Sequence, residues 1–135
     1  MTTRRARAGW AFSATSADKA LAARTAFADH LRASADPSSD LDAAQVIYSE
    51  LVGNVVRHAP GPISIDVDWT RERHARLCVR DSGEGFRADY RLPADRLSEG
   101  GRGLFIVAQL SDTVTVSRDE AGTCVCAILP VQLAA

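Results

Sequence analysis

The strand-like segments of this sequence form two consecutive pairs, and each pair is joined by a turn too short for a crossover. Residues 63–67 alternate Ile and Val with polar residues, and residues 77–80 alternate again after a polar turn. Residues 113–117 and 123–129 repeat this arrangement around a turn at 119–122. Strands connected by such hairpins run antiparallel, because parallel neighbours need a crossover of a dozen or more residues. This feature excludes the doubly wound and P-loop orders.

One more strand and three helices complete the predicted elements. Ser16 and Asp40 are good N-cap residues, since their side-chain oxygens can accept hydrogen bonds from the N–H groups of a first helical turn. The strand is expected at Gly9–Thr15, and the helices from Ser16 to about Ala33, at Leu41–His58 and at Gly103–Leu110. The order β-α-α-β-β-loop-α-β-β predicts an α+β fold: a two-layer sandwich with a mixed, mostly antiparallel sheet and helices on one face.

The chain has 135 residues, so we expect a single domain over residues 1–135, with residues 1–8 as a flexible tail. A formal net charge of −1 argues against a nucleic acid bound mainly through charge, although Arg4, Arg5 and Arg7 leave that hypothesis open. No apolar run approaches the roughly 20 residues of a membrane span, and the N-terminus is not typical of a secretory signal. The expected location is the cytoplasm.

The three cysteines, Cys78, Cys124 and Cys126, are interpreted as small apolar residues of the sheet. An odd number of cysteines without a secretory signal is not typical of a disulfide framework. Cys124 and Cys126 are two residues apart in a predicted strand, so their side chains should face the same side of the sheet. A metal or redox role is the alternative.

The second predicted helix has one apolar and one unusual polar face. At 100° per residue, the apolar face should pack on the sheet, and it collects Ala44, Tyr48, Leu51, Val52, Val55 and Val56. The opposite face collects Glu50, Gly53, Asn54 and Arg57, with His58 at its edge. Glu50 and Asn54 are i, i+4 neighbours, and a carboxylate beside an amide oxygen suits Mg²⁺ or a bridging water. A solvated face with a Glu50–Asn54 contact is the alternative.

Glycine-rich sequences follow at three places. Asp81-Ser82-Gly83-Glu84-Gly85 comes directly after an apolar strand, where an Asp can accept a hydrogen bond from an exocyclic amine such as that of adenine. Gly100-Gly101-Arg102-Gly103 opens the third predicted helix, where free N–H groups and the helix dipole favour a phosphate. Gly122-Thr123 begins the last strand. Taken singly, each sequence is also explained as a turn or a flexible loop.

Taken in order, these motifs resemble the N, G1 and G2 boxes and the closing Gly-Thr of the Bergerat ATP-binding fold, which gyrase and histidine kinases share. They are Glu50-x-x-x-Asn54-x-x-Arg57-His58, Asp81-x-Gly83-x-Gly85, Gly101-x-Gly103 and Gly122-Thr123. The resemblance spans roughly residues 41–128. A free-standing domain with this order is similar to the anti-sigma-factor serine/threonine kinases of bacteria. A histidine-kinase-like catalytic domain acting in trans is an alternative.

The resemblance implies a role for each matched residue. Glu50 would act as general base on the acceptor hydroxyl, and Asn54 would ligate Mg²⁺ at the ATP phosphates. Asp81 would accept a hydrogen bond from the adenine amine, with Thr123 assisting through a water. Residues 86–100 would form the ATP lid.

The remaining matched positions are implied to bind the nucleotide. The glycines of the G1 box would shape the base pocket, and those of the G2 box, with the Arg between them, would surround the phosphates. An Arg of the N box or of the G2 box would neutralise charge in the transition state. These positions are Arg57, His58, Gly83, Gly85, Gly101, Arg102, Gly103 and Leu104.

The implied activity uses ATP and Mg²⁺ to phosphorylate a Ser or Thr of an anti-anti-sigma (STAS-domain) partner. The protein would also sequester a sigma factor and form a homodimer, without direct contact to nucleic acid or membrane. Kinases of this group often carry an Arg two residues before the first glycine of the G2 box, where this chain has Glu99. That departure motivates an alternative: a nucleotide-gated binding protein that holds its partner without phosphotransfer.

Overall fold

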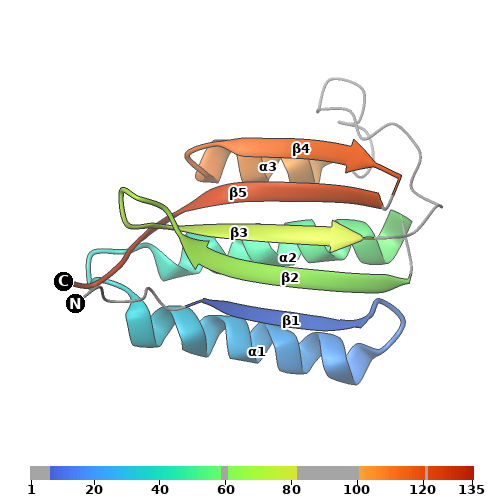
Figure 1. Ribbon diagram of the computed structural model, residues 1–135, viewed down its shortest axis with the longest axis horizontal. Coiled ribbons are helices and arrows are strands. Elements are labelled where there is room, and N and C mark those ends of the chain that lie inside the picture. Colours follow the sequence, from blue (N-terminus) through green and yellow to red (C-terminus); the bar gives the residue numbers. More distant parts are fainter. Residues whose placement is uncertain (1–6, 59–60, 82–100, 121) are drawn as a thin grey trace.

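The computed structural model describes residues 7–58, 61–81, 101–120 and 122–135 (Figure 1). Its elements follow the predicted order along the chain. They are β1 (Ala8–Ser13), α1 (Ala17–Ser34), α2 (Leu41–His58), β2 (Pro62–Trp69), β3 (His74–Asp81), α3 (Gly101–Leu110), β4 (Val114–Asp119) and β5 (Gly122–Gln132).

Both predicted N-caps are confirmed. The Ser16 hydroxyl accepts a hydrogen bond from the backbone N–H of Lys19, and Asp40 Oδ1 accepts one from the N–H of Ala43. These bonds satisfy N–H groups that have no acceptor inside the helix. The caps explain why the two long helices begin where the sequence predicts.

The five strands form one sheet in the order β1-β2-β3-β5-β4, and each of these neighbouring pairs runs antiparallel. The predicted α+β class is confirmed, whereas the expectation of a mixed sheet is wrong. The reason lies in the two long helices: α1 and α2 each reverse the chain, and β2 reverses it once more beside β1 (Figure 1). The expected tail is too long, because Ala8 already pairs with Val67 in the sheet, and residues 1–6 lie outside the described part.

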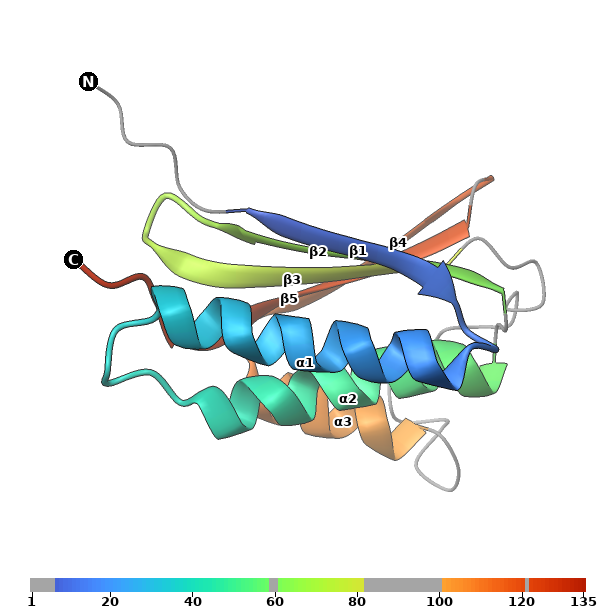
Figure 2. The ribbon, with the colours of Figure 1, turned by 90° about the horizontal axis from the view of Figure 1, so that it is seen from below.

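All three described helices cover the same face of the sheet (Figure 2). Alternate positions of the central strands are buried beneath them, so strands and helices share one core. In this core the rings of Phe27 and Tyr48 stack with their centroids 4.5 Å apart. Other fully buried side chains are Leu31, Ile47, Leu51, Ile63, Ile65, Leu77 and Leu129. None of the described helices is both long and apolar enough to cross a bilayer.

The cysteines lie on the opposite face of the sheet, which we call the open face because no described helix covers it. The interpretation as small apolar sheet residues is wrong for Cys78 and Cys126, which form a disulfide bond between β3 and β5. Register explains the bond, because the two residues are directly opposite one another on neighbouring strands. Cys124 is a free thiol, and its Sγ is 3.8 Å from that of Cys126, so the prediction that these two face the same side is confirmed.

Candidate functional site

Among the described residues, three polar or charged side chains are buried: Asn54, Asp81 and Thr123, with exposed fractions of 3%, 2% and 3%. Asp81 is the last residue of β3, Thr123 is the second residue of β5, and the two are directly opposite one another across the strands. Both lie on the helix-covered face, as the alternation of buried positions requires. Burial of polar groups is costly, so this concentration indicates a role other than packing.

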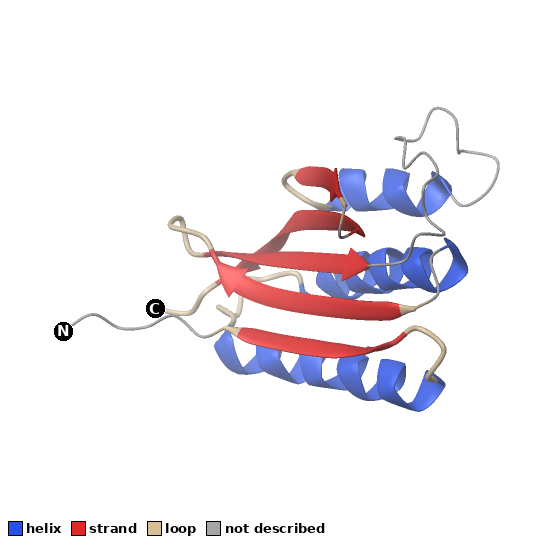
Figure 3. Ribbon diagram, turned by 45° about the vertical axis from the view of Figure 1, so that its right-hand side comes forward, coloured by secondary structure: helices blue, strands red, loops and turns tan. Residues whose placement is uncertain are grey.

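Asn54 reaches the same layer from α2, which packs against β3, β5 and α3. The C-terminal half of α2 runs beneath the end of the sheet where β3 ends and β5 begins (Figures 1 and 3). The three buried polar residues therefore come from elements far apart in the sequence. Asp81 and Thr123 lie side by side on the strands, and Asn54 belongs to the half of α2 that runs beneath this end of the sheet.

The burial of Asn54 corrects the predicted division of α2 into a packed and a solvated face. Asn54 follows Ile47 by two helical turns, so both residues lie on nearly the same side, and Ile47 is fully buried. Helix α3 packs against α2, and its Val107 is fully buried as well. Val56, expected on the packed face, is instead 41% exposed. The prediction was wrong at Asn54 and Val56 because it assumed that α2 packs on the sheet alone.

Glu50 and Arg57 lie on the more accessible side of α2. Glu50 is half-buried and lies one turn before Asn54, so its carboxylate and the Asn54 amide can act on one ligand. Arg57 is exposed, and its Nη1 atom is 3.3 Å from the point that a Cβ on Gly53 would occupy. The absence of a side chain at Gly53 thus leaves room for the guanidinium along the helix. The end of α2 offers a carboxylate, an amide and a cation in succession.

Helix α3 begins at Gly101, two residues before its predicted start at Gly103. Gly101 and Arg102, expected before the helix, therefore belong to its first turn with Gly103 and Leu104. N–H groups in a first turn have no acceptor within the helix, and no acidic residue occupies this turn. The combination favours an anion at this end of α3. The side chains of residues 101–105 lie outside what the structure describes.

Other predicted site residues fall outside the described ranges. Gly83, Gly85 and the expected lid at 86–100 are among them, and so is the side chain of His58 at the end of α2. The buried polar residues of β3, β5 and α2 offer a carboxylate acceptor, a hydroxyl and an amide oxygen. The carboxylate and the hydroxyl can bind an amine of a ligand. The amide oxygen can bind a hard cation that accompanies an anionic group of the same ligand.

Sequence comparison with known proteins covers the same region. Residues 12–129 match the model of the histidine kinase-like ATPase domain family, and this range contains every predicted site residue. The chain is also similar to serine-protein kinase RsbW of Staphylococcus aureus. The sequences from strains JH9, Newman and JH1 are each 31% identical to it, over 62% of this chain and 62% of the relative. The similarity thus spans less than two thirds of the length of these curated relatives.

Proposed function

The chain belongs to the histidine kinase-like ATPase domain family, and on this basis we propose that it binds ATP between α2, the end of β3 and the first turn of α3. The observation that carries the proposal is the burial of Asn54, Asp81 and Thr123, the buried polar residues of the described part of the chain, with Asp81 directly opposite Thr123. Burial of polar side chains is costly, and a bound nucleotide carries hydrogen-bonding groups of the kinds that an amide, a carboxylate and a hydroxyl bind. The proposed unit is one domain over residues 1–135.

Asp81 and Thr123 are assigned to the adenine base in this proposal. A buried carboxylate is a strong acceptor for the exocyclic amine, and a hydroxyl can both donate to and accept from a bridging water. Their register on β3 and β5 keeps the two side chains adjacent. Gly83 and Gly85 would complete the base pocket.

Asn54 and the first turn of α3 are assigned to the phosphates. The donor set fits Mg²⁺, because that cation prefers oxygen ligands and α2 supplies an amide oxygen beside the Glu50 carboxylate. When bound, Mg²⁺ supplies positive charge that neutralises the phosphate oxygens. The backbone N–H groups of residues 101–103 would bind the phosphates, since the N-terminus of a helix favours anions. Further proposed contacts come from Arg57, His58, Arg102, Leu104 and the lid at 86–100.

Phosphoryl transfer to a protein serine or threonine is the proposed activity. Glu50 would accept the proton of the acceptor hydroxyl while that oxygen attacks the γ-phosphorus, the bond to the bridging oxygen breaks, and ADP leaves. The printed name of the relatives, serine-protein kinase, supports a hydroxyl acceptor. We further propose an anti-anti-sigma (STAS-domain) protein as acceptor, a sigma factor as the sequestered partner, a homodimer as the assembly, and a cytoplasmic location that follows from such partners.

A second candidate function is nucleotide-gated binding without transfer. Glu99 favours it, because a carboxylate stands where kinases of this group often have an Arg that reaches the γ-phosphate. Glu50→Ala separates the two functions. A kinase loses labelling of its partner with this variant, whereas a gated binding protein holds its partner as the wild type does and transfers nothing in either form.

The test of nucleotide binding is calorimetric titration with ATP, with and without Mg²⁺, on the wild type, Asn54→Ala and Asp81→Asn. We expect Mg²⁺-dependent binding that either variant weakens. Ser49→Ala is the matched control, because Ser49 is exposed on the same helix. Circular dichroism verifies that each variant is folded. A folded wild type that does not bind ATP would contradict the proposal.

Transfer is tested next with γ-labelled ATP and a candidate STAS-domain partner. An acid-stable label on the partner is expected, since phosphoserine survives acid. An acid-labile label would instead indicate a histidine acceptor and the alternative of a histidine-kinase-like domain acting in trans.

A further inference from the structure

The open face of the sheet carries a row of side chains that crosses four strands. Asp66 on β2 is opposite Cys78 on β3, Cys78 is opposite Cys126 on β5, and Cys126 is opposite Thr115 on β4. Side chains at such paired positions lie on the same face and are close enough to interact. The row lines a hollow of about 360 Å³, on the face of the sheet opposite the helix layer and the proposed nucleotide site.

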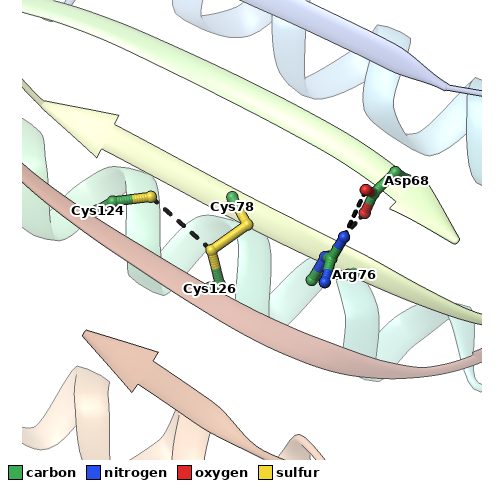
Figure 4. The surroundings of a disulfide bond; sticks show 5 residues. All are labelled: Asp68, Arg76, Cys78, Cys124 and Cys126. Carbon is green, nitrogen blue, oxygen red and sulfur yellow. Dashed lines mark hydrogen bonds and ion pairs between the residues drawn. A yellow bond between two sulfur atoms is a disulfide. The ribbon is translucent and has the colours of Figure 1, made fainter. Parts of the chain in front are cut away.

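Three sulfur atoms gather at this hollow, and we call them the cysteine cluster: Cys78 and Cys126 from the row, and Cys124 two residues earlier on β5. Their Sγ atoms all lie within 4.8 Å of one another, and each residue is half-exposed. Figure 4 shows the Cys78–Cys126 disulfide with the Cys124 sulfur directed toward it. The short distances between the sulfur atoms allow all three to bind one metal ion. Their partial exposure allows reagents in solution to reach them.

The spacing of the sulfur atoms matches that of a metal site. Two thiolates bound tetrahedrally to Zn²⁺ at about 2.3 Å are separated by about 3.8 Å. The Sγ atoms of Cys124 and Cys126 are 3.8 Å apart. Cys78 extends from the neighbouring strand at the register position of Cys126, so its sulfur can form the third corner once it is no longer bonded. Antiparallel strands hold all three ligands in a fixed arrangement.

Arg7, Arg76 and Arg80 line the hollow together with Asp66 and Asp68, and two of these three arginines are paired with carboxylates. The guanidinium of Arg76 forms two hydrogen bonds to the Asp68 carboxylate, at 2.9 and 2.6 Å (Figure 4). Arg80 forms an ion pair with Asp119 at 3.8 Å. Each of the two paired arginines is therefore offset by a carboxylate, and Asp66 adds a further negative charge in the row of Cys78.

We propose that the reduced chain binds Zn²⁺ through Cys78, Cys124 and Cys126, and that formation of the disulfide removes the site. Two molecules of a small thiol reduce the Cys78–Cys126 bond: the S–S bond breaks, the two cysteines gain two electrons and two protons, and the small thiols leave as one disulfide. Three Zn–S bonds then form, the thiol protons pass to solvent, and a water takes the fourth position. A small-molecule disulfide reverses the change: it accepts the two electrons of the Cys78 and Cys126 thiolates, takes up two protons and leaves as two thiols, while the Cys78–Cys126 bond forms and the metal is released.

The proposal is tested by titrating Co²⁺ into the chain under anaerobic conditions without nucleotide, after reduction with a phosphine that does not itself supply thiols. We expect one Co²⁺ per chain, with a thiolate-to-cobalt charge-transfer band and the intense visible bands of a four-coordinate site, all lost on addition of Zn²⁺. The oxidised chain should show none of these bands. This comparison needs no substitution, so folding of a variant does not affect it.

Variants identify the ligands. Cys124→Ser keeps the residues of the disulfide and should lower the Co²⁺ affinity by at least about 100-fold, because loss of even an outer-shell partner costs 10- to 100-fold. Ser117→Ala is the matched control, since Ser117 is exposed and lies opposite Cys124 on β4. Asn54→Ala should bind Co²⁺ as the wild type does, which separates this site from the proposed nucleotide site. Absence of the charge-transfer band in the reduced wild type, equal binding by the oxidised chain, or unchanged affinity in Cys124→Ser would each overturn the proposal.

Discussion

The two faces of the sheet carry different chemistry, although the same two strands build both. On the helix-covered face, β3 and β5 contribute Asp81 and Thr123, which are almost fully buried. On the open face they contribute the cysteine cluster, which is half-exposed. Thr123 and Cys124 are adjacent in the chain yet lie on opposite faces, because strand side chains alternate. A register shift by one residue would therefore exchange the two sets completely.

The difference between the faces concerns access. The helix layer shields oxygen groups on one side, where hydrogen bonds and charges act more strongly because water is excluded. The open side leaves sulfur groups within reach of small reductants, oxidants and metal ions. A single sheet can thus hold an oxygen-based site and a sulfur-based site back to back, and each can be altered without the other.

The largest effect on stability is expected from substitution on the helix-covered face. Leu77 is fully buried, so Leu77→Ala should lower the free energy of unfolding by about 2–5 kcal/mol through lost burial and a cavity. Its neighbour Arg76 lies on the open face, and its hydrogen bond to Asp68 raises the pKa of Arg76. Because that pair is partly solvated, Arg76→Ala should cost less than about 1 kcal/mol. Urea unfolding measures the free energy of unfolding of both variants. Equal decreases in the two variants would contradict the expected difference between the two faces.

Reduction of the disulfide should have the next largest effect. The bond joins residues 48 apart in sequence, so it restricts the unfolded chain and should contribute about 2–4 kcal/mol. Urea unfolding of the metal-free chain with and without a reductant measures the difference. Cys124→Ser retains the disulfide and should show the same loss on reduction. An unchanged urea midpoint would mean that the disulfide bond does not stabilise the folded chain.

ATP affinity should respond to the helix-covered face only. Asp81→Asn removes a charged acceptor while preserving the shape of the side chain, and hydrogen bonds to charged groups contribute about 1.5–3 kcal/mol. We therefore expect calorimetric titration to show affinity weaker by about 10- to 150-fold, as that energy corresponds to at 25 °C. Cys124→Ser should bind ATP as the wild type does. If Cys124→Ser also weakened ATP binding, the two faces would be coupled rather than independent.

The sequence predicts the parts of the fold that depend on neighbouring residues. Asp40 caps α2 by a bond three residues away, and short turns force antiparallel pairing in both hairpins. The motif positions Asn54, Asp81 and Thr123 also stand out in the sequence, and the structure buries all three and pairs Asp81 with Thr123. Local chemistry is sufficient for these features because caps, turns and alternation act within a few residues.

Long-range packing accounts for what the sequence does not predict. The Cys78–Cys126 disulfide exists because β5 inserts between β3 and β4, and no local pattern specifies that strand order. Asn54 is buried and α2 packs against α3 as well as the sheet, whereas a helical wheel treats α2 as if it touched the sheet alone. Knowledge of the strand order and of the β3–β5 register would have placed Cys78 opposite Cys126.

A smaller effect is expected within the core of the helix-covered face. Burial raises the pKa of Tyr48 to about 12, and its hydroxyl has no hydrogen-bond partner among the described residues. Tyr48→Phe removes this buried polar atom and keeps the stacking on Phe27, so stability should be unchanged or higher by up to about 1 kcal/mol. Thermal unfolding measures the shift, and Tyr48→Ala, with an expected loss of about 3–5 kcal/mol, is the matched control. A clear loss of stability in Tyr48→Phe would reveal a partner for the hydroxyl.

The smallest effect concerns the pH dependence of stability near His30, where α1 packs beside β1. The His30 ring contacts Trp10 edge-on with centroids 6.4 Å apart, and burial lowers the pKa of His30 below its ordinary value of 6.5. In the interval below pH 6.5 the unfolded chain therefore binds more protons at this position than the folded chain. The free energy of unfolding should accordingly fall as the pH drops from 6.5 toward the lowered pKa, and should not change above that range. Urea unfolding at several pH values, for the wild type and His30→Gln, isolates the contribution, because the variant lacks the titrating group. Parallel pH profiles for the two proteins would show that His30 has the same pKa in the folded and the unfolded chain. The helix-covered face near β1 would then be as accessible to water as the open face.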